Sequence, residues 1–336
     1  MEQVSAGKKL DQAFEKLGKE KSLSFELDLD ADAATLKALD AASDPEPGEE
    51  IPDEAAKLIS GAKISVTVES RKPIAESEEK DFVGTAVKFS TPSGDLVEFR
   101  SVDDFTYIRA DVKSLSKMMG APLPGMDDLP PEAADLKKVV EGAWVKFRTA
   151  EMAKFGEDIG AEASATPSPE PTLDAKTQKK LLDSLREVVA RKVEFSTSGG
   201  KGDTEHVTAT APVRTLLGEL LTEIRPLAKN LPPSFELPSD KDLKEIPDTR
   251  TTADFTLKNG ALTEVYVDLA KLAENAKVKK FGLSLKMSAG VKPTAPAGAT
   301  ELNPEELMGG LLGFMMPADE FGESDLSDEE DAEGTA

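Results

Sequence analysis

The sequence predicts an α+β protein in which an antiparallel sheet keeps its helices on one face. Apolar residues recur at a period of two in several short segments, a pattern typical of half-buried strands. Tight-turn sequences separate these segments, and Asn259-Gly260 between two of them is a strong hairpin signal. Segments with apolar residues at helical spacing stand before and between the groups of strands. Together these patterns favour a meandering antiparallel sheet with segregated helices.

The first half of the chain begins with a helix and continues as strands. Apolar residues at helical spacing predict a helix over residues 2–18, which Gly18 is suited to end. Leucine and phenylalanine then alternate with polar residues in 21–32, which predicts the first strand. Further strands are expected at 64–68, 83–90, 96–102, 105–110 and 143–147.

The second half repeats this order after a segment rich in alanine, proline and glutamate at 156–173, which predicts a linker or long surface loop. Helices are expected after Asp174 and after Pro212. The expected strands are 193–197, 205–211, 251–258, 261–269 and 281–287. We therefore predict one domain over residues 1–300, built from similar halves at 1–155 and 174–300 that share one sheet. Two separate small domains are the alternative.

Two unlike segments follow this domain. Residues 301–316 are apolar, contain glycine and three methionines, and are too short to span a bilayer. Residues 317–336 carry many aspartates and glutamates and no lysine or arginine, so we expect a disordered acidic tail.

Composition excludes several classes of function. The 336 residues carry 41 basic and 64 acidic side chains, a net charge of -23, which repels nucleic acid and favours a soluble monomer. The absence of cysteine excludes thiolate metal sites and cysteine nucleophiles. The single histidine, His206, lies in a strand pattern, and we expect it to face solvent. No apolar run is long enough for a membrane-spanning helix.

No motif in the sequence supports catalysis. Neither a Gly-x-Ser-x-Gly elbow nor a phosphate-binding P-loop is present. Asp28-x-Asp30-x-Asp32 resembles the start of a calcium loop, but Ala33 and Leu39 replace its required glycine and glutamate. We interpret the three aspartates as polar positions of a strand that runs into a turn. No enzyme activity, cofactor or metal is expected, and a hydrolase using carboxylates is the weakest of the alternatives.

The strand rhythm and one motif resemble a known family. The chain combines a leading helix with Phe105-Thr106-Tyr107-Ile108, then Gly142-Ala143-Trp144-Val145-Lys146, and closes with Phe255-Thr256-Leu257, the Asn259-Gly260 turn and Pro296-Ala297-Gly298-Ala299. Over residues 2–300 this arrangement resembles actinobacterial cell-envelope lipoproteins of the LppX/LprG type, which are relatives of the LolA lipoprotein carrier.

The resemblance implies a half-barrel: a curved antiparallel sheet with helices on its concave face and, between them, an apolar cavity that accepts acyl chains. It also implies an extracytoplasmic lipoprotein attached to the cell surface by a lipidated N-terminal cysteine. This chain has no cysteine, and no apolar signal sequence precedes Lys8-Lys9. We expect Met1 to stand where the processed precursor has its cysteine, so that the lipid anchor belongs to the parent protein.

An apolar ligand in such a cavity would meet the strand residues that face inward. The candidate lining residues are Phe25, Leu27, Val66, Val68, Val87, Phe89, Val145, Phe147, Phe255, Leu257, Leu283 and Leu285. Met118, Met119 and Met126, in the apolar segment 116–129, are candidate gate residues, because methionine adapts to varied apolar surfaces. The segment at 307–316 could serve as a gate or flap in the same way, or both segments could simply cap the core. The predicted function is lipid binding as a carrier or sensor at the cell envelope, with a possible envelope protein as partner. The alternative is a protein–protein interaction module with a filled core and no ligand.

Overall fold

The computed structural model describes residues 2–46, 48, 50–119, 134–151, 184, 187–200, 202–226 and 237–303. The expected linker at 156–173, the apolar segment from residue 304, the acidic tail and Met126 lie outside the described residues. The expected helix after Asp174 is described only in part, with residues 187–192 helical.

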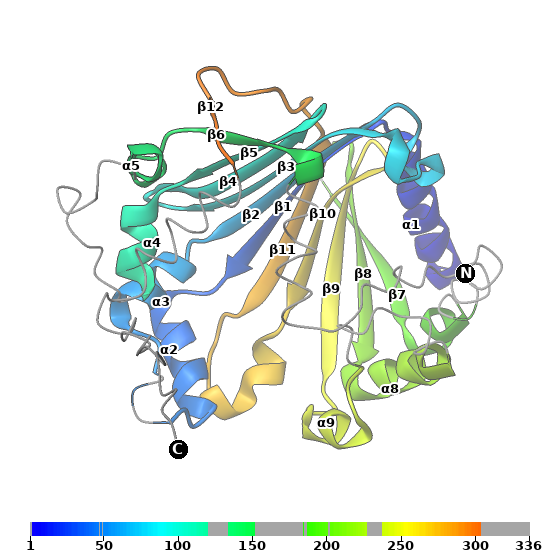
Figure 1. The fold of residues 1–336 in the computed structure, drawn as a ribbon. Helices are drawn as coiled ribbons and strands as arrows, with labels where there is room; N and C mark the ends of the chain where they lie inside the picture. The colour runs from blue at the N-terminus through cyan, green and yellow to red at the C-terminus, as the bar shows by residue number, and fades with distance from the viewer. Residues whose placement is uncertain are drawn as a thin grey trace, which may run out of the picture.

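The described strands form one twelve-stranded sheet (Figure 1). Its spatial order is β12-β6-β5-β4-β3-β2-β1-β11-β10-β9-β8-β7. In chain order the strands are β1 (Ser22–Asp30), β2 (Lys63–Ser70), β3 (Phe82–Thr91), β4 (Gly94–Val102), β5 (Phe105–Ala110), β6 (Val145–Arg148), β7 (Glu194–Gly199), β8 (Thr204–Pro212), β9 (Arg250–Lys258), β10 (Ala261–Asp268), β11 (Gly282–Ala289) and β12 (Thr300–Glu301). Every neighbouring pair is antiparallel except β12 and β6, which are parallel. Because β1 pairs with β11, strands from both halves of the chain belong to one sheet, while the domain boundaries remain a prediction.

Helices flank the sheet, which bends into an arch (Figure 1). They are α1 (Glu2–Lys19), α2 (Ala33–Ala42), α3 (Asp53–Ile59), α4 (Val112–Met119), α5 (Ala134–Val140), α8 (Val213–Ile224) and α9 (Asp240–Glu245), with short 3₁₀ segments at Ile74–Glu76, Glu79–Asp81 and Ala270–Ala276. In Figure 1, α2 to α5 lie along one side of the arch, and α1 and α8 along the other. The predicted α+β class with a curved antiparallel sheet is confirmed. None of the described helices combines the length and apolar character needed to cross a bilayer.

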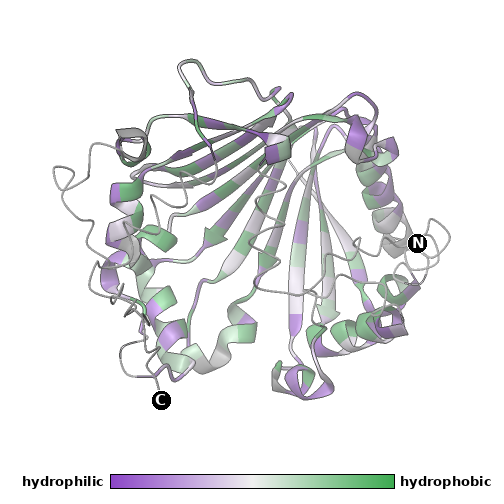
Figure 2. Cartoon of the chain, in the orientation of Figure 1, coloured by the Kyte–Doolittle hydropathy of each residue, from purple (hydrophilic) through white to green (hydrophobic). Residues whose placement is uncertain are grey.

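The two faces of the sheet differ in chemistry, as the alternating colours along the strands in Figure 2 show. We call the apolar face, on which α1 packs, the inner face. There Ala6, Leu10 and Ala13 of α1 form a buried cluster with Val207, Leu257, Leu262 and Met287 of the strands. The outer face is polar. On it Glu26 lies 3.0 Å from the Lys63 ammonium and 3.8 Å from that of Lys286.

Several elements differ from the sequence-based expectation. Asp32 is the N-cap of α2 and accepts a hydrogen bond from the Thr35 amide at 2.7 Å, so it is a helix cap rather than the last polar position of a strand. Helices α2 and α3 were not expected, because their small residues give a weak helical period. The described part of the apolar segment 116–129 is the last turn of α4. Strand β11 is not the last strand, since β12 follows it.

The predicted hairpin turn offers a test of backbone conformation. Asn259 and Gly260 both have positive φ, 52° and 68°, as a two-residue hairpin turn requires. Gly260→Ala is expected to lower the free energy of unfolding by about 1 kcal/mol, because a side chain strains this conformation. Gly7→Ala is the matched control: Gly7 lies inside α1 with open space around its missing Cβ, and the change is expected to stabilise by about 0.5–1 kcal/mol. Urea unfolding of both variants measures the two shifts, and the same sign for both would contradict this account.

Candidate functional site

Cross-strand pairing places all twelve candidate lining residues on the inner face. One row across the sheet contains Met287, Phe25, Val66, Val87, Phe99, Ile108 and Val145. The next row contains Val207, Phe255, Val265, Leu285, Leu27, Ile64, Phe89 and Val97. The remaining candidates, Val68, Phe147, Leu257 and Leu283, lie on the same face in adjacent rows. Ile64, Phe99, Ile108, Val97 and Val265 also lie there; they were not among the candidates, although they follow the same alternation.

The described residues that cover the inner face form three separate buried clusters. The first lies under α1, as described above. The second joins Ala31, Leu36 and Ala56, from the end of β1 and helices α2 and α3. The third joins Val145, Phe147 and Leu302 at the β6 edge. A domain usually has one contiguous core, so three clusters leave part of the sheet between them.

Between the three clusters lies a strip of apolar side chains on the inner face, which we call the central strip. It consists of Leu27, Ile64, Val66, Val68, Val87, Phe89 and Leu283, none of which belongs to the three clusters. Leu27 and Ile64 are direct neighbours across β1 and β2 and are 36% and 42% exposed. Single exposed apolar residues are common, but an apolar pair in the middle of a sheet indicates a surface available to another apolar group.

Three of the candidates are enclosed by the protein's own side chains. Val145 and Phe147 are 2% and 0% exposed and pack with Leu302, a contact that no sequence pattern predicts. Leu257 is 2% exposed beneath α1. These three residues act as core in this structure. The other nine candidates are not buried: six belong to the central strip, and Phe25, Phe255 and Leu285 border the first cluster.

The candidate gate residues are only partly described. Met118 and Met119 form the C-terminal end of α4, a helix that contacts α3, α5 and β4. Their side chains and the whole of Met126 lie outside the described residues. A role for the three methionines as a gate therefore stays a prediction.

A small apolar cavity lies beside the C-terminal end of α1. Leu17, Leu23, Leu262 and Met287 contribute its apolar lining, and its volume is about 170 Å³. Sites for small molecules usually have about 300–1,000 Å³. A lipid chain could use this cavity only together with the neighbouring inner face.

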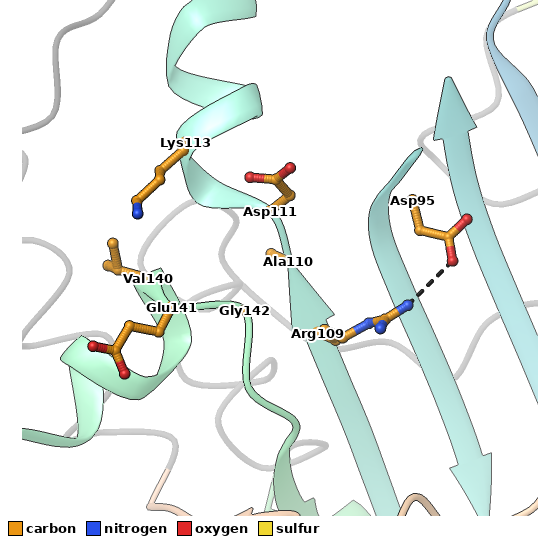
Figure 3. A pocket seen from close by; sticks show the side chains of 8 residues that line it. All are labelled: Asp95, Arg109, Ala110, Asp111, Lys113, Val140, Glu141 and Gly142. Atoms are coloured by element: carbon orange, nitrogen blue, oxygen red, sulfur yellow. Dashed lines mark hydrogen bonds and ion pairs between the residues drawn. The ribbon is translucent and has the colours of Figure 1, made fainter. Parts of the chain in front are cut away.

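A second cavity, of about 380 Å³, includes an ion pair between two of its lining residues, Arg109 and Asp95 (Figure 3). The Arg109 guanidinium lies 3.1 Å from the Asp95 carboxylate and 3.0 Å from that of Glu98. Asp111 accepts hydrogen bonds from the Ser114 hydroxyl and amide at the start of α4, and these bonds lower the pKa of its carboxyl group. The Asp95 carboxylate is thus held in an ion pair and the Asp111 carboxylate at a helix end.

The polar cleft on the outer face is also built from paired groups. It has a volume of about 590 Å³ and includes Asp28, Asp30, Tyr266, Lys280 and Lys286. The Lys280 ammonium lies 2.5 Å from the Asp30 carboxylate, and the Tyr266 hydroxyl donates to Asp30 at 3.1 Å. Within the described ranges, no group of three or more His, Asp or Glu side chains is arranged to hold a metal ion.

Tyr266 offers a test of this cleft by pH. Burial and the hydrogen bond to Asp30 raise the pKa of Tyr266 from 10.0 to about 12. Between these values the folded chain keeps a proton that the unfolded chain loses, so its stability falls as pH rises through that window. Unfolding by urea at a series of alkaline pH values should show a fall that is smaller in the Tyr266→Phe variant. Equal slopes for both proteins would contradict the burial of this hydroxyl.

Trp144, in the motif behind the family resemblance, lies on the outer face. The guanidinium groups of Arg100 and Arg109 both contact the Trp144 ring, with their central carbons 4.9 Å and 5.2 Å from its centroid. The Glu98 carboxylate, in a residue only 8% exposed, accepts hydrogen bonds from both arginines. Trp144 therefore stabilises a charged network by cation–π contact and does not line the inner face. His206 lies in β8 on the outer face, with Nδ1 3.3 Å from the Thr256 hydroxyl.

Among known proteins, only solved structures show similarity to this chain. No protein-family profile matches the chain, and no curated protein sequence matches it. Similar solved structures include the lipoprotein LppX of Mycobacterium tuberculosis, with 10% identity, 87% of this chain and 98% of that chain covered, and a TM-score of 0.30. They also include LprF of Mycobacterium bovis, with 11% identity and a TM-score of 0.34; the match covers 88% of this chain and 98% of LprF. The resemblance to LppX/LprG-type lipoproteins is confirmed as a similarity to solved structures that covers most of the chain. The similarity is too low to support an argument about function.

Proposed function

We propose that this chain binds an apolar ligand, a lipid or an acyl chain, against the inner face of its sheet, as a carrier or sensor without catalytic activity. The observation that carries this proposal is the central strip, in which Leu27 and Ile64 stay 36% and 42% exposed between three separate buried clusters. An acyl chain laid on this strip would gain about 0.8 kcal/mol for each methylene removed from water.

The strip has the dimensions and chemistry of an acyl-chain site. From β11 to β3 it crosses three strand spacings, about 14 Å, and on β2 and β3 it continues through alternate residues. Its described side chains are all hydrocarbon, so they offer no hydrogen bonds with which to select among polar ligands. Selectivity for a headgroup would have to come from residues at the rim of the arch.

We also propose an extracytoplasmic location at the cell envelope, with a lipid anchor in the parent protein. The support is the sequence resemblance to envelope lipoproteins. The net charge of -23 fits a protein that does not adhere to anionic lipid headgroups by its own surface. Separating the parent protein into membrane and soluble fractions, before and after removal of an acyl anchor, tests this location. Recovery in the cytoplasmic fraction would refute it.

Native mass spectrometry of the chain purified without detergent tests the binding proposal. We expect additional masses in the range of lipids, and we expect a fluorescent fatty acid to bind and be displaced by unlabelled palmitate. A clean mass of the bare chain, with no uptake of the fluorescent fatty acid, would contradict lipid binding. That result would favour an interaction module whose strip is covered by a partner protein.

A further inference from the structure

A pocket of about 600 Å³, which we call the rim pocket, lies at one end of the central strip. Its lining includes Thr85 of β3 and Ser101 of β4, which are partners across the two strands. Both face the inner side, because each stands two residues from an inner-face residue, Val87 or Phe99. Val68 of the strip is the direct partner of Thr85 across β2 and β3. The rim pocket therefore continues the strip by one row, and it has the size of a small-molecule site.

Two hydroxyl groups in the rim pocket have no partner in the protein. Within the part of the chain that the structure describes, the side chains of Thr85 and Ser101 make no hydrogen bond, and both are half-buried. Phe82, 39% exposed, also lines the pocket and supplies an apolar wall. A half-buried hydroxyl without a protein partner bonds to water or to a ligand. The rim pocket therefore offers the hydrogen bonds that the strip lacks.

The rim pocket also contains charges of both signs that are not paired with each other. The exposed Arg71 guanidinium makes one long hydrogen bond, to the Lys80 carbonyl at 3.4 Å. Asp103 and Asp104 are exposed in the turn between β4 and β5. Among the described residues, none of these three side chains forms an ion pair. All three charges are therefore free to meet a ligand.

The backbone holds these charged residues in place on both sides of the rim pocket. The Arg71 amide donates to the Asp81 carbonyl at 2.9 Å, just beyond the end of β2. The Asp104 carbonyl accepts from the Thr149 amide, also at 2.9 Å. The strands β2 and β4 are two spacings apart, about 10 Å, and the pocket lies between their ends. A ligand that carries both charges close together can thus contact both sides.

We propose that the rim pocket binds the zwitterionic headgroup of a phospholipid while an acyl chain of the same lipid lies on the central strip. The phosphate accepts hydrogen bonds from the Arg71 guanidinium and from the hydroxyls of Thr85 and Ser101. The ammonium donates to the carboxylates of Asp103 and Asp104. This inference rests on the proposed function and names the class of its ligand.

A headgroup with a single charge fits the rim pocket less well. A phosphate alone would meet the guanidinium of Arg71 but also the two carboxylates of the turn, and like charges at close range lower affinity. An ammonium alone would meet the carboxylates and be repelled by the guanidinium. In phosphoethanolamine two carbons join the phosphate to the ammonium, so each group lies near its opposite charge.

Competition binding in the full chain, freed of bound lipid, tests the headgroup class. Three single-chain lipids with the same acyl chain displace the fluorescent fatty acid: lysophosphatidylethanolamine, lysophosphatidic acid and monoacylglycerol. We expect the first to bind about tenfold more tightly than the other two, the effect of one charge-assisted hydrogen bond. Equal affinities, or tightest binding of lysophosphatidic acid, would overturn the headgroup site and leave the proposed function standing. If neither the fatty acid nor the three lipids bind, the proposed function itself fails.

Substitutions on the phosphate side test the roles of the donors. Arg71→Gln and Thr85→Val should each weaken binding of lysophosphatidylethanolamine several-fold and leave monoacylglycerol unchanged, because only the phosphate uses these groups. Arg191→Gln is the matched control, since it removes the same charge from an exposed residue outside the pocket. An equal loss for the phospholipid in the control, or no loss in either variant, would contradict the assignment.

Substitutions on the ammonium side complete the test. Asp103→Asn with Asp104→Asn should abolish the preference for lysophosphatidylethanolamine over lysophosphatidic acid. Asparagine is suited to this change, because Asp103 has a φ of 53°, which asparagine also accepts. Asp44→Asn with Asp203→Asn alters net charge equally at exposed positions and should keep the preference. Free phosphoethanolamine should not displace the fatty acid at the same concentration. Displacement by it would make the pocket a site for a soluble compound and overturn the lipid assignment.

Discussion

Leu27→Asp combined with Ile64→Asp is expected to weaken binding of a fluorescent fatty acid by more than tenfold and to change stability only slightly. The two side chains are neighbours on the inner face, and they are 36% and 42% exposed. Their carboxylates would keep water in the free protein, but a bound acyl chain would remove it. Burying an unpaired charge against hydrocarbon costs several kcal/mol, which is enough to remove most of the affinity.

A matched control separates the position of these charges from their number. Ser65→Asp with Ser196→Asp adds the same two charges, but both serines face outward, as shown by the pairing of Ser65 with Lys88 and of Ser196 with Thr208. Titration of the fatty acid against both double variants should show weak binding only for the inner-face pair. Equal losses in both would mean that net charge acts and that the central strip is not the site. An unchanged affinity in both would place the ligand elsewhere.

The strands and turns could be predicted because their signals are local. Alternation in β1 to β5 and in β9 to β11 set both the strands and the face that each side chain occupies. The Asn259-Gly260 turn lies where its sequence indicates, since few other residue pairs accept two positive φ values. Helices α2 and α3 lacked such signals. They are short and rich in alanine. Because α2 itself was not predicted, Asp32 could not be recognised as its N-cap from the sequence.

Burial on the inner face could not be predicted from the same alternation. Val66 and Val145 follow one pattern and lie in one row, yet Val145 is enclosed and Val66 is not. The difference is Leu302, which reaches β6 from a point in the chain more than 150 residues away. Pairing of β12 with β6 spans only two residues and leaves no periodic trace. Which apolar residues form core and which remain accessible is therefore decided by contacts between distant segments.

Phe147→Ala is expected to lower the free energy of unfolding by about 3–5 kcal/mol, because it opens a cavity in the cluster at the β6 edge. Phe147 is 0% exposed and packs with Val145 and Leu302. Phe14→Ala is the matched control: Phe14 is 51% exposed on α1, so its loss should change the free energy by less than about 1 kcal/mol. Urea unfolding of the two variants gives both values.

The Phe147→Ala variant also tests whether Phe147 belongs to the core or to the ligand site. Since Phe147 is enclosed by the protein's own side chains, Phe147→Ala should keep nearly the affinity of the unchanged chain for the fluorescent fatty acid under conditions where it is folded. A loss of affinity comparable to that of the Leu27 and Ile64 double variant would mean that the ligand reaches the β6 edge. In that case Leu302 would have to move when the ligand binds, and the third cluster would be part of the site rather than its border.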